Sequence, residues 1–258
     1  MKVNYHTHTP RCQHALGTDE EYIQSAIQSK MDILGISDHG PFPDHDFGLR
    51  MKYEELDEYL NTMGEYASKY QSQLRILKGL EIEYLPEYNN YYEKLIADDR
   101  IDYLLLGEHF YHKKNGEMQN IYSAQSTDTY IEYAQAIVEG MKTGYFNMVV
   151  HPDLMFMGEY AWDDNCSRAT DIIIDAAVKH DYILEYNANG LRREIKDYPD
   201  GQRHPYPHIR FWEQVANTNI RVIVGADAHQ PYQVWDSAVL EAIETTKKLN
   251  LHVIHEIL

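Results

Sequence analysis

The chain has 258 residues, of which 43% are hydrophobic and 25% charged, as is usual for a soluble globular protein. Its net charge of −18 and its lack of a basic stripe exclude nucleic acid as a partner, because such a surface repels phosphate backbones. No apolar run approaches the roughly 18 residues of a membrane span and no apolar leader opens the sequence, so we expect no membrane partner. The two cysteines imply no disulfide framework and favour a cytoplasmic location.

Short β-rich runs alternate with amphipathic segments along the whole sequence. The predicted strands cover residues 2–5, 33–37, 75–82, 103–106, 148–150, 183–186 and 221–225. The first predicted helix begins at a capping-box pattern, in which Thr18 is followed by Glu21. Further helical patterns cover about residues 53–70, 130–141, 166–179, 208–217 and 234–249.

This alternation of strands and helices predicts an α/β fold with a parallel sheet, and seven repeats closing on themselves predict a barrel. No flexible linker or shift in composition divides the sequence, so we expect residues 1–258 to form a single domain. The two longest loops, residues 38–52 and 187–207, are long enough to be functional. The tail, residues 251–258, is expected to add a short final strand.

Side chains of the types that can bind metal ions stand at the ends of these strands. They are His6 and His8 after the first strand, Asp38 and His39 after the second, Glu81 and Glu83 at the third, Glu108 and His109 after the fourth, His151 after the fifth, and Asp227 and His229 after the seventh, with His14 in the loop beyond His8. The carboxyl ends of parallel strands meet at one rim of a barrel, where barrel folds build their active sites. A single histidine is most often structural, but this joint placement predicts a metal cluster.

The spacing of the histidines has a direct geometric meaning. Residues i and i+2 of a strand point to the same side, so His6 and His8 can share one metal ion. Asp227 and His229 repeat this spacing with one harder ligand. The carboxylate of Glu81 can bridge two cations with its two oxygens, which an imidazole cannot do. Bound divalent cations would also reverse the sign of the electrostatic field inside one pocket of an acidic protein. A small phosphorylated substrate is therefore compatible with the net charge.

An ordered set of motifs resembles the PHP (polymerase and histidinol phosphatase) superfamily over essentially the whole length. The motifs are HTHT near the start, ISDHG, GLEIEY, GEHF, VVHPD and GADAH near the end. Within that superfamily the SDHGPFP loop and the segment EYNANGLR are most similar to the histidinol-phosphate phosphatases of histidine biosynthesis. The resemblance implies a distorted (β/α)7 TIM-like barrel, in agreement with the predicted strands.

The resemblance further implies a trinuclear metal site. One metal ion would be bound by His6, His8, Glu81 and Asp227, a second by Glu81, His109 and His151, and a third by His14, His39 and His229. No ligand position is substituted, which argues against an inactive member of the family. Imidazole and carboxylate ligands suit zinc, manganese or iron, and the sequence does not choose among these metals.

The implied activity is hydrolysis of a phosphate monoester, with L-histidinol phosphate as the expected substrate. The hypothesis is that a hydroxide bridging the first two metal ions attacks phosphorus, while the metals stabilise charge in the transition state. Glu81, Asp227 and His229 are the predicted catalytic residues.

The substrate needs further partners around this cluster. The sixth strand, which ends without a metal ligand, leads into Asn187, Asn189, Arg192 and Arg193, and an arginine can bind phosphate in a bidentate way. The alternative is that both arginines form surface ion pairs. Asp44 and His45, in the first long loop, are further substrate-binding candidates for the amine and imidazole of histidinol, with solvated loop residues as the alternative.

Other functions remain open from the sequence alone. A PHP phosphoesterase acting on nucleotides or sugar phosphates would use the same metal ligands. A metal-dependent amidohydrolase also begins its barrel with H-x-H, but that class commonly uses a carboxylated lysine, and here Lys78 falls on the opposite strand face from Glu81. A metal-binding regulatory module is the non-enzymatic alternative. The sequence predicts no oligomeric state.

Overall fold

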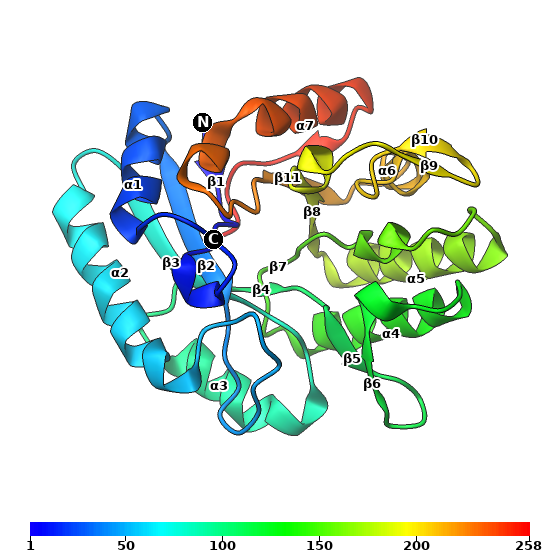
Figure 1. The fold of residues 1–258 in the computed structure, drawn as a ribbon, viewed down its shortest axis with the longest axis horizontal. Helices are drawn as coiled ribbons and strands as arrows, with labels where there is room; N and C mark the ends of the chain where they lie inside the picture. Colours follow the sequence, from blue (N-terminus) through cyan, green and yellow to red (C-terminus); the bar gives the residue numbers. More distant parts are fainter.

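The computed structural model describes residues 1–258, and its centre is an eight-stranded parallel sheet that curls into a barrel with helices outside it (Figure 1). In spatial order the strands are β1 (Val3–Asn4), β2 (Ile33–His39), β3 (Arg75–Ile82), β4 (Tyr103–Leu106), β7 (Met148–Val149), β8 (Ile183–Asn187), β11 (Arg221–Gly225) and β12 (His252–Val253). The predicted α/β barrel and its seven strands are confirmed, and the tail forms the expected short final strand.

The helices follow the strands along the chain. The α-helices are α1 (Asp19–Gln28), α2 (Leu56–Tyr70), α3 (Asn89–Ala97), α4 (Asp128–Thr143), α5 (Asp164–His180), α6 (Ile209–Val215) and α7 (Ser237–Lys248). Short 3-10 turns are η1 (Pro10–Cys12), η2 (Tyr53–Glu55), η3 (Pro86–Tyr88), η4 (Ile121–Ser123), η5 (Leu154–Met157), η6 (Gly190–Arg192) and η7 (Pro231–Trp235). The capping box of α1 is confirmed, because the Thr18 side chain accepts from Glu21 N–H and the Glu21 side chain accepts from Thr18 N–H. No helix is long and apolar enough to cross a membrane.

Two small hairpins and one helix were not predicted from the sequence. The hairpins pair β5 (Phe110–His112) with β6 (Met118–Asn120), and β9 (Lys196–Tyr198) with β10 (Gly201–Arg203). Each of these strands has three residues, too few to show a period-2 apolar pattern. Helix α3 has nine residues and depends on a buried tyrosine pair, Tyr91 and Tyr92, for its packing.

The barrel interior has two layers. The lower layer, toward the amino ends of the strands, is apolar. Tyr103 of β4 fills it against one glycine of β2 and one of β3, and donates its hydroxyl hydrogen to the carbonyl of Tyr5 at 2.7 Å. A Cβ at Gly35 would lie 2.2 Å from the Tyr103 hydroxyl and one at Gly79 would lie 2.4 Å from its ring, so larger residues are excluded. Ile257, the penultimate residue, belongs to the same apolar layer. This packed base leaves the upper layer, at the carboxyl ends of the strands, for polar side chains.

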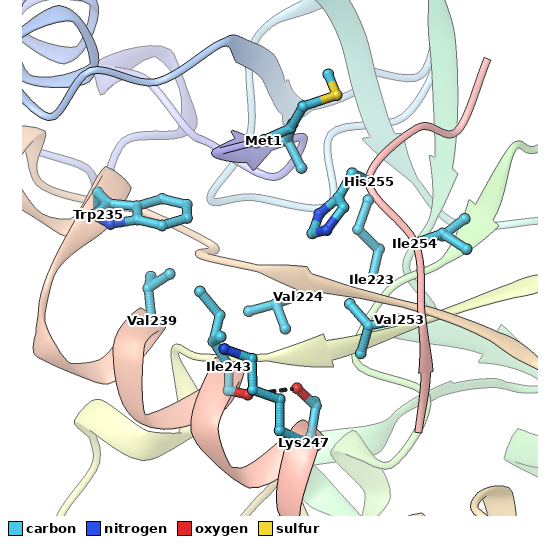
Figure 2. A pocket seen from close by; sticks show the side chains of 12 residues that line it. Met1, Ile223, Val224, Trp235, Val239, Ile243, Lys247, Val253, Ile254 and His255 are labelled. Atoms are coloured by element: carbon cyan, nitrogen blue, oxygen red, sulfur yellow. Dashed lines mark hydrogen bonds between the residues drawn. The ribbon is translucent and has the colours of Figure 1, made fainter. Parts of the chain in front are cut away.

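The seam between the first and seventh strands is held loosely. An isolated parallel bridge joins Thr7 to Ala228, beyond the ends of β1 and β11. Nearer their amino ends, β11 pairs with β12 instead of β1. A mostly apolar cavity of about 330 Å³ lies beside this seam, between α7 and the strands, with Trp235 and Val239 on its helical side (Figure 2). This open seam is the distortion of the barrel.

Candidate metal centre

Histidines and carboxylates from opposite ends of the chain meet above the apolar layer. His6 and His8 extend from β1, and their Nε2 atoms lie 3.1 Å apart. Asp227, just beyond β11, places Oδ1 3.1 Å from His8 Nε2 and 3.6 Å from His6 Nε2. All three residues are buried. The period-2 argument for His6 and His8 therefore predicted their shared direction correctly.

Glu81 is the centre of this cluster. Its Oε2 lies within 3.3 Å of three imidazole nitrogens and its Oε1 within 3.5 Å of two more; the five residues are His6, His8 and His39 around Oε2, and His109 and His151 around Oε1. Gly107, on the strand-end segment of β4, makes room for this carboxylate, since a Cβ there would lie 2.3 Å from Glu81 Oε1. Each oxygen thus faces a different group of nitrogens, as a bridging ligand must.

A second group of imidazoles lies at the mouth of a polar cavity above the cluster, distinct from the apolar cavity beside the seam. The Nε2 atoms of His14 and His229 are 2.9 Å apart, and with His39 they offer three ligand atoms within 4.8 Å of one another. Burial lowers the pKa of His14, and burial with the nearby His8 lowers the pKa of His229 to about 3. Both rings are therefore held neutral, the form that binds metal ions.

These donors fit divalent cations. Glu81 Oε2 and Asp227 Oδ1 are buried and have no hydrogen-bond partner. Burial alone would raise the pKa of both carboxyls, but the surrounding histidines hold each pKa well below its ordinary value. Buried ionised oxygens without a hydrogen-bond donor are costly unless a cation balances them, and a mixed set of imidazoles and carboxylates binds zinc, manganese or iron.

The backbone at two of these residues is strained. His151 has φ +33° and Asp227 has φ +45°, and neither residue is a glycine. Left-handed backbone in such residues costs about 1–3 kcal/mol and is found mainly where function requires it. In both cases the strained residue follows a strand end and points its side chain into the cluster.

Further polar side chains hold the ligands in place. Glu83 accepts a hydrogen bond from His109 Nδ1 at 3.0 Å and receives Arg50 in a bidentate pair at 2.9 and 3.0 Å. Burial alone would raise the pKa of Glu83, but Arg50 and His109 lower it to about 2. Asn187 and Asn189 both donate to Asp227 Oδ2, at 3.2 and 3.1 Å, which leaves Oδ1 facing the histidines.

The two predicted phosphate-binding arginines differ in their surroundings. Both line the cavity of about 350 Å³ above the cluster. Arg192 is held by Asp236, at 2.8 and 3.1 Å, and by the carbonyls of Ala226 and Gln233. Arg193 instead places its guanidinium over the Tyr206 ring, 5.6 Å from the centroid, and forms no ion pair. Arg193 is therefore the arginine that keeps its hydrogen bonds for a ligand.

The structure does not bring Asp44 and His45 to this cavity. They line a separate hollow formed by the loop after β2. Asp44 accepts a hydrogen bond from the Tyr88 hydroxyl at 2.5 Å, and the His45 ring lies 4.2 Å from that of Phe47. The loop folds over α3 because Phe42 packs against Tyr88, and this contact carries the two polar residues away from the metal ligands.

Sequence reasoning missed three residues of the site. Tyr122, from η4, stacks beside His109 with ring centroids 6.1 Å apart, and Tyr206 faces the same cavity. Glu185 lies buried inside β8, the sixth predicted strand, and was not among the predicted site residues. A charged residue within the apolar run ILEYN was the available signal, because an unpaired glutamate is almost never fully buried.

Lys78 lies outside the cluster. Its ammonium group binds Asp102 at 2.7 Å on the other face of β3, so no lysine stands where an amidohydrolase would have its carboxylated bridging ligand. The barrel, with its buried histidine and carboxylate cluster at the carboxyl ends of the strands, defines a metal-dependent hydrolase.

Comparisons with known proteins identify the family. Residues 4–189 match the PHP domain, and the chain belongs to this family. A Deinococcus radiodurans protein named probable histidinol-phosphatase is 28% identical over 89% of this chain and 86% of its own length. The histidinol-phosphatase of Bacillus subtilis is 22% identical over 89% of this chain and 94% of its own length.

Solved structures share the fold. The HisK protein of Listeria monocytogenes superposes with a TM-score of 0.75 at 20% identity, covering 92% of this chain and 98% of that protein. Histidinol phosphate phosphatase of Lactococcus lactis, in complex with zinc, L-histidinol and phosphate, has a TM-score of 0.71 at 16% identity, covering 98% of this chain and 95% of that one.

Proposed function

We propose that this chain is a histidinol-phosphate phosphatase, which hydrolyses L-histidinol phosphate to L-histidinol and phosphate. The observation that carries the proposal is the convergence of five histidines on Glu81, beneath a cavity with one unpaired arginine, Arg193. Relatives with this activity in their names match the chain over most of their own length, which supports the choice of substrate.

The proposed cofactor is a set of three divalent ions, of zinc, manganese or iron. His6, His8, Glu81 and Asp227 would bind the first ion, Glu81, His109 and His151 the second, and His14, His39 and His229 the third. When bound, such ions supply Lewis acidity and make water acidic enough to act as a nucleophile near neutral pH. The zinc in the Lactococcus lactis relative supports this class of cofactor.

The chain's own residues have distinct proposed roles. Glu81 and Asp227 are the charged ligands, and His229 lies at the mouth, where the phosphoryl group would enter. Arg193 binds a phosphoryl oxygen, and because it extends over the same cavity, it orients the ester toward the cluster. Asn189 lines the cavity beside the substrate, whereas Asn187 is fully buried behind Asp227 and acts by holding that carboxylate.

Two aromatic rings suit the other half of the substrate. Tyr122 and Tyr206 line the cavity with Arg193, and a flat imidazole can stack on such rings. The larger hydrophobic cluster contains residues from Tyr22 to Leu251, and this shared core supports the proposal of a single domain for residues 1–258.

The test is a phosphate-release screen of the manganese- or zinc-loaded protein against histidinol phosphate, nucleoside monophosphates and sugar phosphates. We expect kcat/KM for histidinol phosphate to exceed the others by at least about tenfold. A clear preference for a nucleotide would replace the substrate and keep the metal chemistry. A chain that binds no metal ion would overturn the whole proposal.

A further inference from the structure

Glu185 is a buried carboxylate that touches the metal cluster without facing its centre. It lies within β8 with no exposed surface, and its Oε1 is 2.8 Å from His6 Nδ1. Its other oxygen, Oε2, accepts from the backbone N–H of His151 at 3.0 Å and from Asn187 Nδ2 at 2.8 Å. Both oxygens are thus occupied by donors that belong to the ligand set or to its support.

The barrel is shaped to admit this side chain. A Cβ on Gly225, in the neighbouring strand β11, would lie 1.6 Å from Glu185 Oε1, so only glycine leaves room for the carboxylate. In the same way, the missing side chain at Gly107 leaves room for the Glu81 carboxylate. A charged glutamate buried in the core is costly unless it is paired and hydrogen-bonded.

We propose that Glu185 is a positioning residue that fixes the tautomer and direction of His6 and the backbone of His151, so that both rings present Nε2 to metal ions. The Glu185 carboxylate accepts a hydrogen bond from Nδ1–H of His6. The lone pair of the His6 ring is then on Nε2, which faces Glu81 and Asp227. A carboxylate behind a histidine ligand both orients the ring and makes it a better donor.

The two contacts of Glu185 make an isosteric test possible. The backbone N–H of His151 can only donate, so in Glu185→Gln the amide oxygen must face His151 to satisfy it. The amide NH2 group then faces His6 Nδ1, which must accept, and the proton moves to Nε2, where it blocks metal binding. The opposite amide orientation places two N–H donors against each other. Either orientation disturbs a ligand, although the volume is unchanged.

Glu108→Gln is the matched control. Glu108 is equally buried, but its Oε1 accepts only from Tyr84 N–H at 3.2 Å and its Oε2 has no partner. The Glu108 side chain has no hydrogen bond to a metal ligand, and the amide oxygen of a glutamine can accept the same hydrogen bond from Tyr84 N–H.

The experiment measures zinc affinity by competition with a chromogenic chelator, and cobalt spectra of the substituted site, for the full-length wild type and both variants. We expect Glu185→Gln to weaken binding of at least one ion about 10- to 100-fold and to change the cobalt spectrum. Glu108→Gln should match the wild type in both measurements. Equal affinity and spectra in Glu185→Gln and the wild type would overturn the inference.

If Glu185→Gln does not fold, the wild type itself provides the test. Long-range proton–nitrogen spectra of histidine-labelled protein report the tautomer of His6, which we expect to carry its proton on Nδ1; a proton on Nε2 overturns the inference. This inference rests on the metal-binding part of the proposed function and on no particular substrate. Failure of the wild type to bind any metal would sink the proposed function, whereas undisturbed binding in Glu185→Gln would remove only the role of Glu185.

Discussion

Replacing the two adjacent arginines separately tests which one binds the phosphate. In Arg193→Met, the substrate loses a bidentate partner that makes no ion pair within the protein. A charge-assisted hydrogen bond contributes about 1.5–3 kcal/mol, so a bidentate contact weakened by partial exposure is worth about 3–4 kcal/mol. This corresponds to a loss of about 10²- to 10³-fold in kcat/KM, with metal content and thermal stability unchanged.

Arg192→Met should have the opposite pattern. The change leaves Asp236 and the carbonyls of Ala226 and Gln233 without their partner in a mostly buried location. Breaking such a pair costs about 3–5 kcal/mol, or roughly 10 °C in Tm for a chain of this length. Steady-state phosphate release and calorimetry on both variants measure the two effects. The reasoning is refuted if Arg193→Met retains wild-type kcat/KM, or if Arg192→Met is the variant that loses activity at full stability.

Three further predictions concern the cluster and its supports. Gly107→Ala should lose bound metal and activity together, because its Cβ would lie 2.3 Å from Glu81 Oε1. Gly64→Ala, on open helix surface, is the control and should change neither the metal content nor the rate of phosphate release. Removing metal with a chelator should abolish phosphate release and lower Tm, and reloading should restore both. The expected change in Tm follows because a ligand at 100 times its Kd stabilises the folded chain by about 2.7 kcal/mol. An unchanged Tm would count against a structural role of the ions. The pKa of Glu83 is about 2 in the folded chain against an ordinary 4.5, so its stabilisation is present above pH 4.5 and is lost as the pH falls toward 2. Acid titration of Glu83→Gln should therefore show a flatter loss of stability over that window, and an identical titration curve would contradict the assignment.

The strands, and the gathering of histidines and carboxylates at one rim, were predictable because each depends on local periodicity. The spacing of His6 and His8 sets their direction on a strand, and parallel strands bring every carboxyl end to one rim. Loop directions were not predictable in this way. Asp44 and His45 lie apart from the ligands because Phe42 packs on Tyr88, a contact between segments far apart in sequence.

The distinction between Arg192 and Arg193 was also beyond the sequence, since it depends on the position of Asp236 in space. Glu185 was missed for a different reason. Its partner His6 is 179 residues away, and only the closed barrel brings the two together. Buried polar contacts of this kind leave no periodic signal in the chain.

Metal ions bound in the cluster would also connect the two sides of the loose seam of the barrel. His6 and His8 stand on one side of it and Asp227 and His229 on the other, while the backbone contributes the Thr7–Ala228 bridge, which consists of two hydrogen bonds. Cations bound between these side chains would cross-link the first strand to the seventh. A newly made chain would then complete this set of side chains only after β11 has been synthesised, because Asp227 and His229 follow that strand.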